Sequence, residues 1–451
     1  MQRREFLQGG LSIGAGAAWL ASYAAAADEP RAPDKQAAAG KPSAPDELNL
    51  AVIGIGSQGR ALIRAAMLVP GVRFRALCDI WDYARTYGKN FFKTQEQDVA
   101  VYEDYREMLE REKGLHAVLI ATPDFVHAAQ TLACLKAGLH VYCESPMSNA
   151  REQSLAMAEA ARAAGKLLQI GYQRRSNPRY RHAHERLLGE MKLPGRIVQL
   201  ATCWAQPPAD DRGWPRRFPV ADDVLKRHGY DSMARLRNWI HAKQLGSGLW
   251  GGLAAHQIDV LNWFLDATPT CVLASGGSDY YTARQWPDNV TALYEYPTPE
   301  GPVRAACQVL STTSAGGAGH FEHVMGISGS VKMSENPKWT KLYREADADE
   351  WDDWAAKGYV AKSKRSNEPP PTSGEKLVHE TGQVETYEFP VVFDKPPLQP
   401  HVQNFFEAVR GRGSLNCPPP IALAAEATVF AAYEAITQRR AVAFPAGRMS
   451  G

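Results

Sequence analysis

The chain has 451 residues, 45% of them hydrophobic and 22% charged, which is ordinary for a globular protein and sufficient for two domains. Its net charge of +2 provides no basic field for a polyanion, and Lys and Arg do not cluster among aromatic residues, so we expect no nucleic acid partner. The 7 cysteines and 12 histidines lack the spacing of a disulfide framework or of a metal site, so neither is predicted.

The N-terminal segment has the features of an export signal. Arg3 and Arg4 precede a Phe-Leu pair, a weakly apolar stretch rich in Gly and Ala, and a run of alanines. This pattern predicts a twin-arginine signal peptide over residues 1–27, with export of the folded protein to the periplasm. An uncleaved anchor is the alternative, and after cleavage we expect no stable membrane insertion. Residues 28–47 mix Pro, Ala, Gly and charges without periodicity, which predicts a disordered linker.

A nucleotide-binding pattern begins at Leu48. The apolar strand LNLAVI is followed by Gly54-x-Gly56-x-x-Gly59 and a helix, and the next strand ends in Asp79. In such a unit the first glycine permits a tight turn, the second lets the backbone approach a pyrophosphate on the helix N-terminus, and the third lets helix and strand pack closely. The Asp79 carboxylate would meet a ribose hydroxyl and repel a 2′-phosphate. The sequence therefore favours NAD over NADP.

Strands and helices continue to alternate up to residue 170. Helices are expected at 104–114, 125–138 and 149–165, and strands at 116–122, 139–144 and 166–172. This alternation predicts a doubly wound parallel sheet, whose ligands lie beyond the carboxyl ends of the strands. The residues predicted to contact the dinucleotide are Gly54, Gly56, Ser57, Gln58, Gly59, Arg60, Asp79, Thr122, Pro123, His127, Glu144 and Ser145. Arg60 and Arg85 are the nearby cations that keep NADP as the alternative.

Residues 171–451 have a different pattern and are predicted to form a second domain. Segments that mostly alternate in polarity occur at 196–204, 271–281, 289–296, 304–313 and 323–333. They predict an α+β domain with a large, mainly antiparallel open sheet, beside the N-terminal Rossmann sheet of residues 48–170. Residues 340–375 are expected to form a polar surface insertion, in which Trp351 and Trp354 pack down the loop, with contact to the substrate as the alternative. A final helix around 423–440 should pack back on the body.

Five motifs occur in a fixed order from Leu48 towards the C-terminus: GIGSQGR, ATPDFVH, CESP, GYQRRSNPRYR and GGLAAHQIDVLNW. In this order they resemble the Gfo/Idh/MocA family of nicotinamide-dependent sugar and polyol oxidoreductases. The resemblance implies a small-molecule carbohydrate substrate, and a homodimer or homotetramer joined through the outer face of the second sheet. Some members of the family carry twin-arginine signals.

Hydride transfer requires a group that takes the alcohol proton. His256 matches the histidine motif of the family, and an imidazole suits proton exchange near neutral pH. Asp259 lies one helical turn further on, where it would orient the imidazole or stabilise the helix N-terminus. Two departures from the family pattern stand out. Ser145 occupies the position of the lysine in the usual Glu-Lys-Pro triplet, and Gly252 that of an aspartate four residues before the histidine.

Other side chains are candidates to replace the two missing groups. Glu144 and Tyr172 are predicted to act with His256 as catalytic residues. Lys166, His320 and His323 are further candidates. The residues predicted to bind the substrate are Gln173, Arg174, Asn177 and Asp259. Arginines suit hydroxyls or a carboxylate, although Arg174 and Arg175 could equally form a surface pair at the start of a helix.

The resemblance implies an enzyme that oxidises or reduces a hydroxyl of a sugar, polyol or glycoside with NAD. Because the periplasm has no dependable pool of free NAD, we expect an exported enzyme to keep its cofactor tightly bound and to restore it in each cycle. An NAD-dependent glycosidase is the alternative, since such enzymes often lack the lysine. They use a tyrosine near the histidine, however, and Leu253 and Ala254 offer none. A catalytically dead sugar-binding module is a third interpretation, which the intact glycine loop with Asp79 disfavours.

Overall fold

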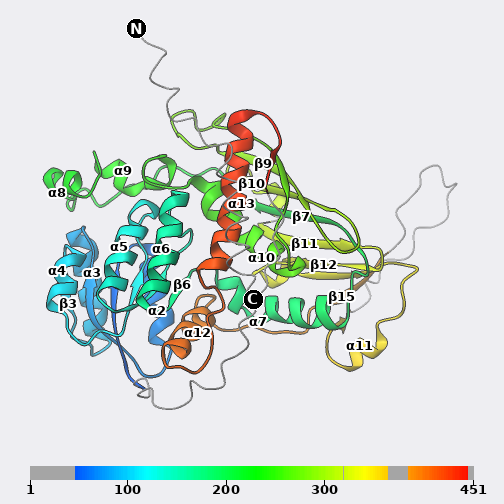
Figure 1. Ribbon diagram of the computed structural model, residues 1–451, viewed down its shortest axis with the longest axis horizontal. Helices are drawn as coiled ribbons and strands as arrows, with labels where there is room; N and C mark the ends of the chain where they lie inside the picture. The colour runs from blue at the N-terminus through cyan, green and yellow to red at the C-terminus, as the bar shows by residue number, and fades with distance from the viewer. Residues whose placement is uncertain (1–45, 318, 364–383, 445–451) are drawn as a thin grey trace, which may run out of the picture.

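The computed structural model describes residues 46–317, 319–363 and 384–444. The predicted signal peptide, nearly all of the predicted linker and residues 364–375 lie outside this part of the chain. Figure 1 shows two halves side by side, a sheet surrounded by helices and a larger sheet, with helix α13 running between them.

The first half contains six parallel strands in the order β3-β2-β1-β4-β5-β6, which confirms the predicted doubly wound sheet. The strands are β1 (Leu48–Ile53), β2 (Val72–Cys78), β3 (Ala100–Tyr102), β4 (Ala117–Ile120), β5 (His140–Cys143) and β6 (Leu168–Ile170). The helices are α2 (Ser57–Met67), α3 (Asp82–Thr94), α4 (Tyr105–Arg111), α5 (Asp124–Lys136) and α6 (Arg151–Ala164). The strand order reverses between β1 and β4, so a ligand crevice is expected beyond their carboxyl ends.

Helix α3 and strand β3 occupy a segment for which the sequence suggested no element. The buried residues of α3 are Ala84, Gly88 and Phe92, which recur every four positions and form one apolar face. Gly88 lets this face approach the sheet, because a Cβ at Gly88 would lie 2.9 Å from the Leu77 side chain. The helical period was present in the sequence but interrupted by polar residues.

The second half is built on a ten-stranded mixed sheet in the order β14-β15-β13-β12-β11-β7-β10-β9-β8-β16. Its strands are β7 (Ile197–Ala205), β8 (Cys271–Gly277), β9 (Asn289–Tyr296), β10 (Val303–Leu310), β11 (His320–Gly326), β12 (Gly329–Met333), β13 (Lys341–Arg344), β14 (Ala361–Lys362), β15 (Glu385–Glu388) and β16 (Val442–Ala443). Strands β7 and β10 pair in parallel and the other pairs are antiparallel, as expected for a mainly antiparallel sheet.

Two details of this half correct the sequence interpretation. Residues 323–333 do not form one strand, because the chain reverses after Gly326 and pairs β11 with β12 in a hairpin. The start of the predicted surface insertion belongs to the sheet as β13, and β14 also pairs there. Between them, Trp351 packs on Tyr387 beside helix α11 (Asp352–Ala356), with ring centroids 4.9 Å apart.

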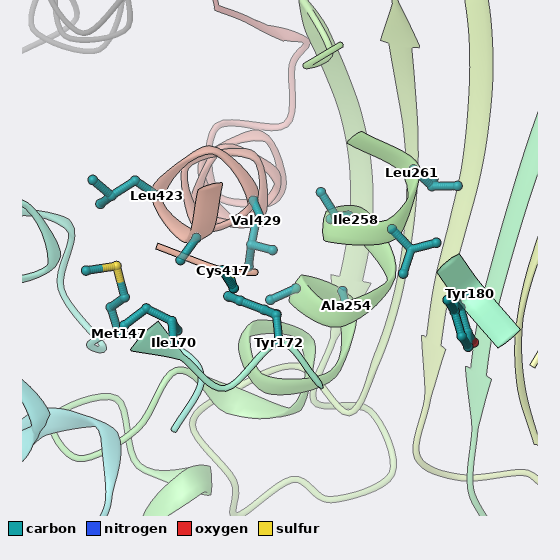
Figure 2. Packing of buried hydrophobic residues seen from close by; sticks show 14 of the residues in the cluster. Met147, Ile170, Tyr172, Tyr180, Ala254, Ile258, Leu261, Cys417, Leu423 and Val429 are labelled. Atoms are coloured by element: carbon teal, nitrogen blue, oxygen red, sulfur yellow. The ribbon is translucent and has the colours of Figure 1, made fainter. Parts of the chain in front are cut away.

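Helices from the second half cover both sheets. They are α7 (Pro178–His182), α8 (Asp222–Arg227), α9 (Met233–Arg237), α10 (Ala255–Leu265), α12 (Gln399–Val409) and α13 (Pro419–Gln438). Helix α13 packs against α10, β8 and α6, which confirms the expected return of the final helix to the body. In Figure 2, Leu423 of α13 faces Met147 of the first half and Val429 faces Ile258 of α10. Helix α12 packs on α2 and completes the core of the first sheet.

Residues 207–246, termed the strap, connect β7 to the segment before α10 and lie against the first half. The Trp81 indole N–H donates to the Phe218 carbonyl at 2.7 Å, and the Phe125 N–H donates to the Leu245 carbonyl at 3.3 Å. Apolar side chains of the strap, including that of Tyr230, are buried in the same cluster as the core of the first sheet. Figure 1 places the strap helices α8 and α9 beside the first half.

Candidate active site

The glycine loop after β1 has the shape that a dinucleotide requires. Gly54 has φ +94°, and a Cβ there would lie 2.5 Å from the Ala121 carbonyl oxygen. A Cβ at Gly59 would lie 1.9 Å from the Gly54 oxygen, so only glycine lets α2 pack so closely. At Gly56 nothing lies within 4 Å of the Cβ position, so the backbone is open to a ligand. These three positions fit a pyrophosphate on the N-terminus of α2.

A cavity of about 1390 Å³ begins at this loop and extends between the two halves. Every residue predicted to contact the dinucleotide lines it, except Gly59, which is used for packing. Of the predicted catalytic and substrate-binding residues, Glu144, Gln173 and His256 also line it. The structure therefore joins the predicted nucleotide site to part of the predicted catalytic site.

Asp79 lies at the end of β2, at the wall of the cavity. Its carboxylate accepts the backbone N–H groups of Ile55 at 2.7 Å and Trp81 at 2.8 Å, which fixes its orientation. Burial raises the pKa of Asp79, and these two hydrogen bonds oppose the shift. Arg85 is not free to bind a phosphate, because it donates to the Asp79 carbonyl at 2.7 Å and pairs with Asp82 at 3.3 Å.

His127 connects the turns that follow β4 and β5. The ring is fully buried, with Nδ1 2.9 Å from the Pro146 carbonyl oxygen and Nε2 2.8 Å from that of Thr122. The imidazole thereby holds the two turns together at the edge of the cavity. We assign His127 a positioning role at the site rather than a contact with a reacting group.

Glu144 and Ser145 follow β5 at the same edge of the sheet. Burial raises the pKa of Glu144 to about 7, although the Gln58 amide donates to the carboxylate at 3.0 Å and opposes the shift. A carboxyl group with this pKa can accept or release a proton near neutral pH. The Ser145 hydroxyl lies 3.0 Å from Nε2 of His256. The position of the missing lysine is thus occupied by a hydroxyl that contacts the predicted catalytic histidine.

His256 occupies the first turn of α10, and distant segments of the chain orient its ring. The Tyr172 ring packs edge-on against the imidazole with centroids 5.2 Å apart, and the Trp204 ring lies 6.4 Å away. Burial and, to a smaller extent, Arg174 lower the pKa of His256 to about 3, so the imidazole is neutral at physiological pH and does not titrate near neutral pH as the sequence analysis expected. Its Nδ1 is buried and has no hydrogen-bond partner among the described residues.

The predicted catalytic role of Tyr172 is wrong in this geometry. The Tyr172 hydroxyl lies away from the cavity and donates to Glu426 of α13 at 3.4 Å. Burial raises the pKa of that hydroxyl well above its ordinary value, which disfavours proton release. Glu426 also accepts the Met147 N–H at 2.6 Å, so α13 holds the segment after Ser145 in place. Tyr172 therefore positions the imidazole through its ring.

Three of the predicted substrate-binding residues bind other groups of the protein and do not line the cavity. Arg174 is buried and pairs with Glu322 and with Glu335, and the second pair is 3.2 Å apart. The buried Asp259 carboxylate accepts hydrogen bonds from Nε of Arg175 through both of its oxygens, each at 2.9 Å. These pairs correct both interpretations of the two arginines, since neither guanidinium lines the cavity and neither is on the surface. The Asn177 side chain caps α7 by accepting the Arg179 N–H at 2.9 Å. Of the four, only Gln173 lines the cavity.

The other candidate bases lie away from the cavity. Lys166 precedes β6, at the end of the strand opposite the site. His320 stacks on Trp204 with centroids 4.7 Å apart, and its Nε2 lies 3.3 Å from Glu335. Nε2 of His323 lies 3.0 Å from the Ser330 hydroxyl within the second sheet. Within the described chain Lys166, His320 and His323 do not line the cavity, so the structure does not support their predicted role.

The structure adds lining residues that the sequence interpretation missed. They include Gln206, Trp239, Tyr281 and Ser311. Trp239 belongs to the strap, which was not recognised as part of the site. Its length between β7 and α10 was a usable signal, because long connections in compact domains are commonly functional.

Two negative observations apply to the described residues 46–317, 319–363 and 384–444. No three His, Cys, Asp or Glu side chains there are grouped so as to hold a metal ion. Within the same ranges, no helix has the length and apolarity needed to cross a membrane.

Comparison with known proteins places the two halves in one family. The model of the Gfo/Idh/MocA oxidoreductase family, NAD-binding Rossmann fold, matches residues 48–172, and the model of its C-terminal alpha/beta domain matches residues 219–444. The chain is 27% identical over 220 residues to inositol 2-dehydrogenase 2 of Saccharopolyspora erythraea, a match that covers 48% of this chain and only 54% of that relative.

Two solved structures share the whole architecture. Levoglucosan dehydrogenase in complex with NADH and L-sorbose has a TM-score of 0.65 at 18% identity, over 88% of this chain and 99% of that chain. Aldose-aldose oxidoreductase from Caulobacter crescentus, complexed with glycerol, has a TM-score of 0.64 at 16% identity, with the same two coverages. At these identities the matches establish the fold. Together with the family models, they show that the chain is an NAD-binding member of the Gfo/Idh/MocA oxidoreductase family.

Proposed function

We propose that the protein oxidises or reduces a hydroxyl group of a sugar, polyol or glycoside with NAD held in the cavity between its halves. The observation that carries this proposal is the contact of Ser145 with His256, beside Glu144, in the cavity that starts at the glycine loop. The names of the relatives support the substrate class, since they include an inositol dehydrogenase, a levoglucosan dehydrogenase and an aldose oxidoreductase.

One set of residues would hold the cofactor and another would transfer the proton. Gly54, Gly56 and Asp79 would hold the dinucleotide, which supplies hydride transfer when bound. His256 is neutral and presents Nε2 to the Ser145 hydroxyl at 3.0 Å, so the substrate proton can reach the imidazole directly or through Ser145. Glu144, with its pKa of about 7, is the second group able to exchange a proton there.

We further propose that NAD stays bound through the catalytic cycle and is restored by the same substrate or by a second one. The support is the strap, which packs on the first half and lines the cavity with residues such as Trp239. We expect that release of a dinucleotide from the cavity requires the strap to move. A retained cofactor also suits the periplasm, where free NAD is scarce.

An NAD-dependent glycosidase is the second candidate. Such an enzyme needs acid and base groups for elimination and hydration besides the hydride transfer, and two titratable groups, Glu144 and His256, line the same cavity. Neither the buried Tyr172 hydroxyl nor Leu253 and Ala254 supplies the tyrosine expected near the histidine, which leaves Tyr281 among the tyrosines of the cavity wall. We rank the net oxidoreductase first because the relatives are named as dehydrogenases and an oxidoreductase.

One experiment separates these functions. The purified protein is denatured to release its nucleotide, and the native protein is mixed with inositols, aldoses, anhydrosugars and glycosides, with and without added NAD. We expect bound NAD and either NADH or a keto sugar as the product. Hydrolysis of glycosides without net NADH would favour the glycosidase. A protein that neither contains nor binds NAD would contradict both. Gly56→Val, which fills the space beside the loop, should lose nucleotide and turnover together.

We also propose export to the periplasm by the twin-arginine route. The support is the Arg3-Arg4 pair followed by the weakly apolar segment up to residue 27. In cell fractionation, the parent chain should appear in the periplasm and the double variant Arg3→Lys/Arg4→Lys should remain in the cytoplasm. An equal distribution of parent and variant would contradict the proposal.

A further inference from the structure

Six arginines line the cavity within the described chain, and they fall into two groups. Three of them are neutralised by carboxylates. These pairs are Arg106 with Asp104, Arg227 with Glu103 at 3.2 Å, and Arg284 with Asp211 at 3.0 Å. The other three, Arg60, Arg212 and Arg237, form no ion pair with a described residue. The unpaired group therefore adds positive charge to the wall of the cavity.

The unpaired arginines come from both halves of the molecule. Arg60 lies in the first turns of α2, next to the glycine loop, whereas Arg212 and Arg237 belong to the strap. Contacts bring all three towards Asp79. The Arg212 N–H donates to the side chain of Asn238, which follows Arg237, and Arg237 lies over Trp81, whose N–H donates to Asp79. Arg60 donates to the carbonyl of Ile55, whose N–H also donates to Asp79.

Two of these guanidinium groups are held in place without any anion. Nε of Arg60 donates to the Ile55 carbonyl at 3.0 Å, and the group lies 3.6 Å from the centre of the Tyr87 ring. Nε of Arg237 donates to the Gly213 carbonyl at 3.0 Å, and the group lies 5.3 Å from the centre of a ring, that of Trp81. Bonds through Nε leave the terminal N–H groups available, and such forks match phosphate oxygens.

No carboxylate of the described residues forms an ion pair with these three guanidinium groups, so their terminal N–H groups can bind an anion. The anion expected next to Arg60 is the dinucleotide pyrophosphate on the N-terminus of α2. We propose that Arg60, Arg212 and Arg237 form a phosphate site that spans the two halves and closes on the pyrophosphate of the cofactor. The site is complete only when the strap lies on the first half, so the strap recognises the cofactor as well as covering it. This inference rests on NAD binding and not on the substrate.

The test measures binding of nucleotides to the full chain by calorimetry and by the fluorescence change of tryptophan, after bound nucleotide has been removed. The probes are NAD, NADP and adenosine, which has no phosphate. Arg212→Gln and Arg237→Gln should each weaken NAD binding roughly tenfold, because each removes a charged hydrogen bond to phosphate, and should speed NAD release. Adenosine binding should not change. Arg217→Gln is the matched control, since it removes an exposed arginine of the strap that does not line the cavity.

The outcomes identify which phosphate is bound. Equal weakening of NAD and NADP supports the pyrophosphate, whereas weakening of NADP alone supports a phosphate site for the ribose 2′-phosphate and overturns the pyrophosphate assignment. The phosphate site is overturned if Arg212→Gln and Arg237→Gln bind NAD as tightly as Arg217→Gln does. It is also overturned if they lose as much affinity for adenosine as for NAD. Arg237→Lys should recover part of the affinity, which separates loss of charge from misfolding. Absence of turnover with every carbohydrate would contradict the proposed reaction and leave these binding results unaffected.

Discussion

Replacing His256 with asparagine should lower kcat by roughly 100- to 10,000-fold, the range typical of a lost general acid or base. Asparagine retains polarity and much of the shape of imidazole but cannot accept a proton. NAD binding should be unchanged, because the glycine loop and Asp79 do not depend on this side chain. The measurement is steady-state turnover with the substrate identified above, together with NAD affinity for the same preparation.

Two further variants test how the proton reaches His256 and whether Glu144 also accepts one. Ser145→Ala removes the hydroxyl 3.0 Å from Nε2 and should reduce kcat less than the histidine variant if the proton also reaches His256 directly. Glu144→Gln should remove the rise in oxidation rate with pH through about 7, since deprotonated Glu144 would be the form that accepts a proton. Full turnover of His256→Asn with normal NAD affinity would exclude the imidazole as the proton-transfer group.

Replacing Asp259 with alanine should lower the free energy of unfolding by about 3–5 kcal/mol, because the charge of Arg175 would stay buried without a partner. Asp259 is 1% and Arg175 6% exposed, so water cannot replace the lost contact without a change in structure. Urea unfolding followed by circular dichroism measures the effect. The double variant Arg175→Met/Asp259→Leu should recover most of the loss, since replacing a buried pair with apolar side chains is often neutral.

A surface pair provides the matched comparison. Arg227 and Asp223 are 60% and 76% exposed and 3.6 Å apart, so Asp223→Ala should change the free energy of unfolding by less than about 1 kcal/mol. A similarly small effect of Asp259→Ala would mean that Arg175 finds another partner or reaches solvent. In that case the buried pair would not be the structural link between the segment after β6 and α10.

The residues that the sequence predicted for the nucleotide site, except Gly59, line one cavity, and the signals that located them are local. The glycine spacing, the apolar strand before it and Asp79 at the end of the next strand lie within one βαβ unit, where backbone geometry determines how they meet. The Ser145 and His256 contact is less local, since 111 residues separate them. The contact itself was not predicted, and only the family motifs placed both residues at the site.

The errors concern side chains whose partners lie far away in the chain. Tyr172 donates to Glu426, 254 residues later, and Arg175 pairs with Asp259, 84 residues later. A sequence pattern locates these residues near the site but does not show the direction of their side chains. A buried polar group needs a hydrogen-bond partner, and here each partner is distant in the chain. The strap was missed for a related reason. Its short helices carry little periodicity, and its role depends on the half of the molecule against which it lies.

The position of helix α12 constrains the order in which the protein can be completed during synthesis. Val402, Phe405 and Phe406 fill the core beneath the first sheet, and Gln169 donates to the His401 carbonyl at 2.8 Å. The ribosome makes the strands of that sheet more than two hundred residues before it makes α12. Until then this core lacks the three side chains of α12, so we expect the nascent nucleotide-binding half to be incompletely packed.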